Sequence, residues 1–233
     1  MIKSLTNNKI KYINSLNSKK NRLKEKKFLV EGFHLVEEAK SSGALVEVLC
    51  TENYDFENVT IVTKEIIDKI SKSLSPQKII GVCKITEIKN DSNRILILDD
   101  ISDPGNLGTL IRSAVGFGFS KIIVSKDTCD IYNDKVLRST QGAIFKVEII
   151  KGDLLTEIAK LNGYNILGSS LNGKELSNHT VDGKIAIVLG NESRGISKEI
   201  LNVCDDVVFI ETDTIESLNV ATAGSILMYV FRI

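Results

Sequence analysis

The sequence predicts an α/β protein with two domains, a smaller one over residues 1–90 and a wound, mostly parallel sheet over residues 91–233. Three observations support this prediction. A length of 233 residues allows one large domain or two modest ones. The net charge is +5 in residues 1–90 and −5 in residues 91–233, although the whole chain balances at zero. From residue 94 onward, short apolar runs rich in β-branched residues alternate with helical segments, as in a parallel sheet covered on both faces.

The first domain is expected to be a small α/β unit. A polar helix begins after Thr6, and two further helices are expected at residues 33–40 and 64–72. The expected strands lie at residues 28–30, 44–50, 59–62 and 78–85. The polar stretch at residues 89–93 is the expected linker to the second domain.

The second domain is expected to contain six strands and a terminal apolar helix. The strands are predicted at residues 95–98, 122–124, 145–150, 165–167, 185–189 and 207–210. Residues 218–231 are apolar on nearly every helical face, so this segment must be buried in the core or against a second subunit.

Several functional classes lack their sequence signals. The four cysteines, at positions 50, 83, 129 and 204, form neither a CxxC pair nor a compact disulfide framework, and His34 and His179 are too few for a zinc site or a histidine triad. No apolar stretch approaches the roughly 18 residues of a membrane span, and no secretory signal is present, so a cytoplasmic protein is expected. Neither GxGxxG nor GxxxxGK[ST] occurs, which argues against a dinucleotide or P-loop nucleotide enzyme.

Positive charge is concentrated near the N-terminus, where residues 1–30 hold nine Lys or Arg and a single acid. The densest run comprises Lys19, Lys20, Arg22, Lys24, Lys26 and Lys27. Such a run can follow a phosphate backbone, and each neutralised phosphate adds salt-dependent affinity. An ordinary solvated surface is the alternative interpretation.

Three loops follow predicted strands, where ligands bind in parallel sheets. In the first, Pro104 and Gly105 set a turn, Asn106 is the expected cap of a helix, and Arg112 is expected within its first two turns. The second runs from Gly190 to Gly195. The third spans residues 212–217. Each has a simpler structural interpretation: a capped helix with a surface arginine, an exposed turn pair of Glu192 and Arg194, and Ser217 as no more than a helix cap.

Taken together, these loops resemble the motifs of the SpoU (TrmH) family of RNA ribose methyltransferases in the SPOUT superfamily. The first family motif, Asn-x-Gly-x-x-x-Arg, matches Asn106, Gly108 and Arg112. The second, GxExxG, begins at Gly190, and the third, ESLNV, occupies residues 216–220. Residues 130–142 also resemble a family segment, and the N-terminal half resembles the ribosomal-protein-like substrate-binding domain of these enzymes.

The resemblance implies a trefoil knot in the C-terminal segment, S-adenosylmethionine as cofactor, RNA as partner and a homodimer with a composite site. Backbone around Gly190, Ile210 and Leu218 would hold the cofactor. The catalytic residues implied are Asn106, Arg112, Glu192, Ser217 and Asn219, and no metal is required. One departure concerns the segment before the third motif, which lacks the family's usual proline and is one residue short.

The function implied is S-adenosylmethionine-dependent methylation of a ribose 2′-hydroxyl, in ribosomal RNA rather than transfer RNA because of the kind of N-terminal domain. A transfer-RNA methyltransferase and a non-catalytic RNA-binding factor that keeps the fold are the alternatives. A nucleotide-dependent oxidoreductase is disfavoured by the missing dinucleotide fingerprint.

Overall fold

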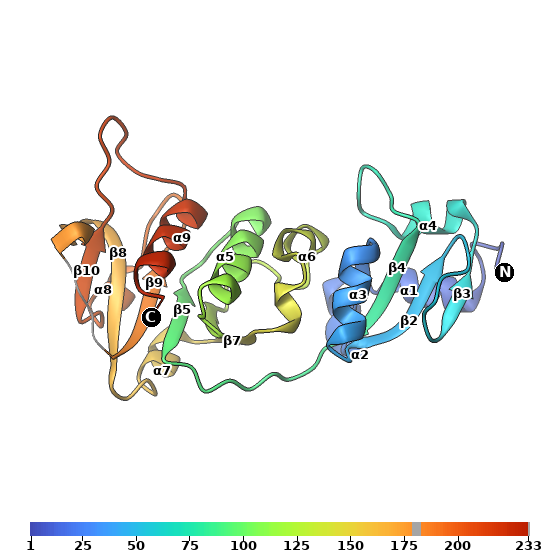
Figure 1. Cartoon of the computed structure of the whole chain (residues 1–233), viewed down its shortest axis with the longest axis horizontal. Helices are drawn as coiled ribbons and strands as arrows, with labels where there is room; N and C mark the ends of the chain where they lie inside the picture. The colour runs from blue at the N-terminus through green and yellow to red at the C-terminus, as the bar shows by residue number, and fades with distance from the viewer. Residues whose placement is uncertain (179–182, 233) are drawn as a thin grey trace. The chain divides into compact units, whose positions relative to one another are not determined.

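The computed structural model describes residues 1–178 and 183–232 (Figure 1). The chain divides into two compact units. Unit 1 comprises Met1–Glu87 and Tyr132–Phe145, and unit 2 comprises Ile88–Ile131 and the described part of Lys146–Ile233. His179 lies outside the described residues. In the part of the chain that is described, no helix is long and apolar enough to cross a membrane.

Unit 1 is built on a four-stranded sheet of order β1-β4-β2-β3. Its strands are β1 (Lys27–Glu31), β2 (Leu45–Cys50), β3 (Val59–Ile61) and β4 (Ile79–Lys84). The β4 strand runs antiparallel to β1 and β2, whereas β2 and β3 are parallel. Its helices are α1 (Asn8–Ser15), α2 (Lys19–Glu25), α3 (Phe33–Ser41), α4 (Lys64–Ile70), α6 (Asp134–Thr140) and the 3₁₀ helix η1 (Ala143–Phe145).

Every element predicted for residues 1–85 is present, with ends shifted by at most two residues. The α2 helix was not predicted, because its exposed lysines hide any helical apolar period. The core of the unit packs α1 and α4 on the sheet through Ile10, Ile13, Ile66 and Ile67. Burial of these side chains on one face of each helix explains why the short helices are stable.

Residues 132–145 belong to unit 1, although the sequence prediction places them in the second domain. The physical reason is an aromatic cluster around Phe28 of β1. Its ring centroid lies 4.7 Å from that of Tyr132 and 6.0 Å from that of Phe145. Such pairs contribute beyond their buried area. The main division of the chain falls after Glu87, three residues before the predicted boundary.

Unit 2 is built on a six-stranded sheet of order β10-β8-β9-β5-β6-β7. Its strands are β5 (Arg94–Leu98), β6 (Lys121–Ser125), β7 (Glu148–Gly152), β8 (Tyr164–Glu175), β9 (Lys184–Leu189) and β10 (Asp206–Phe209). All the strand pairings described in this sheet are parallel, which confirms the predicted α/β class. Its helices are α5 (Pro104–Gly116), α7 (Leu154–Ile158), α8 (Lys198–Leu201), α9 (Val220–Val230) and the 3₁₀ helix η2 (Leu176–Asn178).

Helices cover both faces of this sheet. One face packs against Leu154 and Ile158 of α7 and Ile200 of α8. The other carries α5 and α9, which lie side by side in Figure 1. At Gly224 of α9 a Cβ atom would lie 2.5 Å from the side chains of Leu110 and Leu189, so only glycine allows this close approach. The terminal helix is therefore fixed against both α5 and β9.

Two strand predictions for unit 2 are wrong in detail. Phe145 lies in η1, and the strand expected from residue 145 begins at Glu148. The β8 strand continues to Glu175 rather than ending at residue 167, because after a bulge in β10 its outer half pairs with Val208 and Phe209. The terminal helix is buried on one side within the chain, whereas Tyr229 and Val230 are 53% and 45% exposed, so its burial against a second subunit stays a prediction.

Candidate active site

A pocket of about 430 Å³ lies in unit 2, where several of the parallel strands end. It is lined by residues 169–172 of β8, by residues 189–195 at and after the end of β9, and by residues between β10 and α9. The predicted cofactor-binding residues Gly190, Ile210 and Leu218 all line this pocket. The structure thus brings together three positions that are up to 28 residues apart in the sequence. Residues 169–172 were missed, because the sequence indicates no strand beyond residue 167.

The loop from Gly190 to Gly195 folds tightly on itself. Asn191 and Gly195 exchange backbone hydrogen bonds of 3.0 and 2.9 Å. A Cβ atom at Gly190 would lie 2.1 Å from the carbonyl carbon of Gly195, and Gly195 itself has φ of +69°. Both glycines of the second motif are therefore required by the backbone: the first by contact and the second by conformation.

The carboxylate of Glu192 joins this loop to the start of α5. Its Oε2 accepts hydrogen bonds from Ser102 Oγ at 2.8 Å and Ser102 N at 3.3 Å. Its Oε1 accepts from Asp103 N at 3.1 Å and from Asn106 Nδ2 at 3.0 Å. Four donors from one segment converge on one carboxylate, which favours its ionised form.

The pKa of Glu192 reflects this balance. Partial burial alone would raise it, but the hydrogen bonds from Asn106, Ser102 and the backbone N–H groups of Glu192 and Asp103 outweigh burial and lower the pKa to about 2. Glu192 is therefore a fixed anion at neutral pH. A carboxylate with so low a pKa is a poor acceptor for the proton of a reacting hydroxyl.

Asn106 extends the network to the third loop. Its Oδ1 accepts a hydrogen bond of 3.1 Å from Asn219 Nδ2. Asn219 in turn caps α9, because its Oδ1 accepts from the backbone N–H groups of Ala221 and Thr222. Asn106, Glu192 and Asn219, one from each predicted motif, are thus directly hydrogen-bonded to each other in a chain.

The expected cap of α5 at Asn106 is wrong, and the alternative interpretation of Ser217 as a helix cap does not hold. Asp103 caps α5, since its Oδ1 accepts from Asn106 N at 2.9 Å, and this leaves the Asn106 amide free to contact Glu192 and Asn219. Asn219 caps α9, so Ser217 is not a helix cap and instead lines the pocket. At the start of each helix, the capping residue is the Asp or Asn whose side-chain oxygen reaches the second or third helical N–H group.

Arg112 lies apart from this network. Because α5 begins at Pro104, Arg112 is in its third turn, not within the first two as predicted. Its side chain is exposed and, among the residues that the structure describes, has no hydrogen-bond or ion-pair partner. The guanidinium is therefore available to a ligand, although it does not line the 430 Å³ pocket.

Sequence reasoning missed a second group of contacts that holds the loop after β9. Arg194, a pocket-lining residue, forms an ion pair with Asp100 rather than a turn pair with Glu192. Asp100 has φ of +59°, an uncommon conformation for a residue other than glycine. Its carbonyl accepts from Asn191 Nδ2 at 2.9 Å, and its N–H donates to Ser125 Oγ at 2.9 Å. Nothing in the sequence indicates that an aspartate adopts a positive φ, so Asp100 was not predicted to be a site residue.

The basic run in unit 1 separates into surface and interior residues. Lys19, Lys20, Lys24 and Lys26 are exposed, and the Lys27 ammonium lies over the Tyr12 ring. Arg22 is only 8% exposed, and its Nη1 donates to the carbonyls of Leu16 and Asn17 at 3.0 and 2.8 Å. Arg22 therefore closes the end of α1 and is placed differently from its lysine neighbours.

The parallel sheet, the pocket at its strand ends and the network joining three loops define an α/β protein with a small-molecule site at the carboxyl ends of its strands. Comparisons with known proteins identify the family. A model of the SpoU rRNA methylase family matches residues 93–229, and a model of the MRM3-like substrate-binding domain matches residues 7–81. The chain belongs to the SpoU rRNA methylase family, and the predicted enzyme class and S-adenosylmethionine cofactor are confirmed.

Similar proteins match almost the whole chain. A 23S rRNA (guanosine(2553)-2′-O)-methyltransferase from Bacillus subtilis is 34% identical over 244 residues, covering 99% of this chain and 98% of the relative. An rRNA methyltransferase from Sinorhizobium meliloti, solved with S-adenosylmethionine bound, has a TM-score of 0.86 at 26% identity, covering 98% and 95%. A TrmH-family RNA methyltransferase from Porphyromonas gingivalis has a TM-score of 0.84 at 28% identity, covering 97% of each chain.

The Glu192 network predicts a measurable pH dependence. The carboxylate has a lower pKa in the folded chain, about 2, than the ordinary 4.5 expected when unfolded, so its hydrogen bonds stabilise the fold fully above pH 4.5. That stabilisation is lost as the pH falls towards 2. We expect the urea midpoint of the Glu192→Gln variant to fall less steeply than that of the wild type across this window. Identical slopes for the two proteins would contradict the assigned hydrogen bonds.

Proposed function

We propose that this enzyme transfers a methyl group from S-adenosylmethionine to a ribose 2′-hydroxyl of 23S ribosomal RNA. The proposed target is the guanosine that corresponds to the target of the Bacillus subtilis relative. The observation that carries the proposal is the 34% identity across 99% of this chain and 98% of that relative. The match includes the region that would select the RNA, and not merely the region that would bind the cofactor. A transfer-RNA substrate has no comparable support, since the tRNA-modifying structural neighbours cover 62% and 59% of this chain.

The pocket fits the cofactor in size and in the character of its walls. Its volume of about 430 Å³ is within the usual range of about 300–1,000 Å³ for small-molecule sites. Backbone around Gly190, Ile210 and Leu218 would hold the cofactor, and residues 169–172 would close the opposite side. When bound, S-adenosylmethionine supplies an electrophilic methyl group on a sulfonium.

The protein's part in the reaction is to align a weak nucleophile and manage its proton. A neutral ribose hydroxyl reacts only when it is held in line with the methyl group, and such alignment contributes up to about 7–11 kcal/mol in favourable cases. The Glu192 anion, which lines the pocket, fixes the Asn106 amide, and Asn106 in turn accepts a hydrogen bond from Asn219. Ser217, two residues before Asn219 in the sequence, also lines the pocket.

Arg112 is the proposed catalytic arginine. Its guanidinium stays protonated up to a pKa above about 12, so it is unsuited to act as a base. It would instead bind a phosphate of the RNA and polarise the attacking 2′-oxygen, while the proton leaves to phosphate or water. The absence of a protein partner for Arg112 among the described residues supports this role.

The proposal also includes a knotted C-terminal segment, a ribosomal-protein-like fold for the N-terminal unit and a cytoplasmic location, where ribosomes are assembled. The knot is supported by the segment between β10 and α9. Its residues Ile210 and Leu218 line the same pocket as the loop after β9, and α9 then packs on α5 and β9.

A homodimer is proposed through the face of α5 and α9 that is open to solvent. A hollow of about 490 Å³ on this face is lined by Asn106, Thr109 and Asn219, together with Ile226 and Tyr229 of the apolar terminal helix. A second copy covering it would bury the exposed apolar side chains and bring partner groups to the network.

Sedimentation equilibrium tests this interface. The wild type is expected to be a dimer and the Tyr229→Glu variant a monomer, because a carboxylate would be buried at the centre of the contact. Leu155→Glu, which places the same charge at an exposed position of α7, is the matched control and should remain dimeric. A dimeric Tyr229→Glu protein would refute this face as the interface.

The activity is tested with tritiated-methyl S-adenosylmethionine and unmodified 23S rRNA, followed by nuclease digestion and mapping of the label. We expect one 2′-O-methylguanosine. Arg112→Ala should lower methyl transfer by at least a hundredfold while cofactor affinity, measured by calorimetry, changes by less than about threefold. Label on a base, or near-normal transfer by Arg112→Ala, would contradict the proposed chemistry.

The exposed lysines of α2 and its end are proposed to contact RNA phosphates. Replacing Lys19, Lys20, Lys24 and Lys26 by Ala should weaken RNA binding and reduce the slope of log K against log salt by about 0.7–0.9 per lost contact. The control is a variant with the same charge change on unit 2, at Lys126, Lys160, Lys184 and Lys198. An equal slope for the α2 variant and the wild type would contradict the proposed RNA contact and show that these lysines form an ordinary solvated surface.

A further inference from the structure

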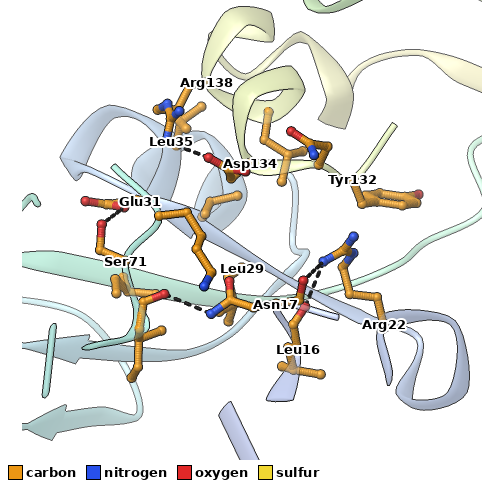
Figure 2. A pocket seen from close by; sticks show the side chains of 16 residues that line it. Leu16, Asn17, Arg22, Leu29, Glu31, Leu35, Ser71, Tyr132, Asp134 and Arg138 are labelled. Carbon is orange, nitrogen blue, oxygen red and sulfur yellow. Dashed lines mark hydrogen bonds and ion pairs between the residues drawn. The ribbon is translucent and has the colours of Figure 1, made fainter. Parts of the chain in front are cut away.

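Unit 1 contains a second cavity, of about 210 Å³, that the proposed reaction does not use (Figure 2). It lies between the end of α1, the α2 helix, the β1 strand, the residues after α4 and the start of α6. All of its walls belong to the same compact unit. The cavity is therefore a feature of the N-terminal unit and is separate from the pocket at the strand ends of unit 2.

Three polar side chains at this cavity keep unused hydrogen-bonding groups. Asn17 Nδ2 donates to Ile70 O at 2.9 Å, whereas its Oδ1 accepts no hydrogen bond from the described residues. Asn133 Oδ1 caps α6 by accepting from Lys135 N at 2.9 Å, whereas its Nδ2 has no acceptor among them. The Lys72 ammonium likewise has no partner in the described part of the chain. The cavity thus offers an amide acceptor, an amide donor and a cation.

The acids at the cavity are already committed to protein partners. Glu31 accepts from Ser71 Oγ and from Gln77 N, both at 2.7 Å. Asp134 forms an ion pair of 2.9 Å with Arg138. Figure 2 shows both pairs at one side of the hollow. The cations at the cavity, Arg22, Lys72 and Arg138, outnumber the acids Glu31 and Asp134, so the net charge is positive and favours a ligand that carries or adjoins an anion.

The remaining walls are flat or apolar. The Tyr132 ring is held against Phe28 with centroids 4.7 Å apart, and the Arg22 guanidinium is fixed by the carbonyls of Leu16 and Asn17. Leu29 and Leu35 add apolar surface. Flat aromatic or guanidinium faces, with amide groups placed around an apolar floor, are the features by which proteins bind unpaired RNA bases.

From these contacts we infer that the cavity binds one unpaired nucleobase of the RNA substrate, with Lys72 contacting the adjoining phosphate. The inference rests on the proposed function, since it takes the RNA as the ligand. Its volume of about 210 Å³ is below the range of about 300–1,000 Å³ for larger small-molecule ligands and suits a single base. The α2 helix also links the two contacts, because it carries the exposed lysines on one side and supplies Arg22 to the cavity wall.

The experiment measures binding of the full chain to an unmodified 23S rRNA fragment that contains the target, and to a series of the same fragment with one abasic site at each unpaired position. For the wild type, one abasic position is expected to weaken binding on the order of tenfold, the usual size of a base-stacking contribution. Lys72→Gln and the cavity-filling Leu29→Phe should each weaken binding of the intact fragment and lose most of the effect of that abasic site. Lys69→Gln, which removes the same charge from an exposed position on α4 outside the cavity, should behave as the wild type.

Full sensitivity to the abasic site in both cavity variants would overturn the inference, as would a wild type that is insensitive at every position. Binding of free nucleoside monophosphates to the cavity without any abasic effect would also overturn it, by indicating a small-molecule site. Methyl transfer at saturating RNA separates this inference from the proposed function. If the wild type fails to methylate the fragment, the proposed function fails. If the wild type methylates it while the cavity variants bind like Lys69→Gln, the cavity inference alone fails.

Discussion

The carboxylate of Glu192 is the interaction on which the candidate active site depends. It collects donors from Ser102, Asp103 and Asn106, and so holds the loop after β9 against the first turn of α5. The N-terminus of a helix is a favourable place for an anion, which adds to the effect of the hydrogen bonds. Without this anion the Asn106 amide would have no fixed orientation, and the contact to Asn219 would not be specified. A single charge therefore sets the relation between three motifs that lie far apart along the chain.

Close backbone and helix contacts provide the second constraint. Gly190 lets the loop after β9 fold onto its own end, and Gly224 lets α9 approach the sheet. These contacts lie near the two ends of the network, because Gly190 is two residues before Glu192 and Gly224 is five residues after Asn219. The hydrogen bonds between the motifs are possible because both backbones are already held in place, which is the usual requirement for a preorganised site.

The sequence predicted the parts of the structure that depend on local patterns. Apolar runs gave the strands of both units, and the spacing of Asn106, Glu192 and Asn219 in family motifs gave the network residues. What it could not predict depends on tertiary contacts. The α2 helix has few apolar residues, the outer half of β8 exists because β10 pairs with it, and Asp100 adopts a positive φ because Asn191 and Ser125 hold it. Arg22 looks like its lysine neighbours in sequence and differs from them only through the carbonyls at the end of α1.

The return of residues 132–145 to unit 1 affects the order in which the protein can fold during synthesis. The Phe28 cluster cannot close until Phe145 has been synthesised, and by then the residues of β5 and β6 of unit 2 have also been synthesised. The N-terminal unit is thus not an independent first folding step, although domains of multidomain chains generally fold in the order of synthesis. The N-terminal unit can be completed only after the residues of the first strands of unit 2 have been synthesised.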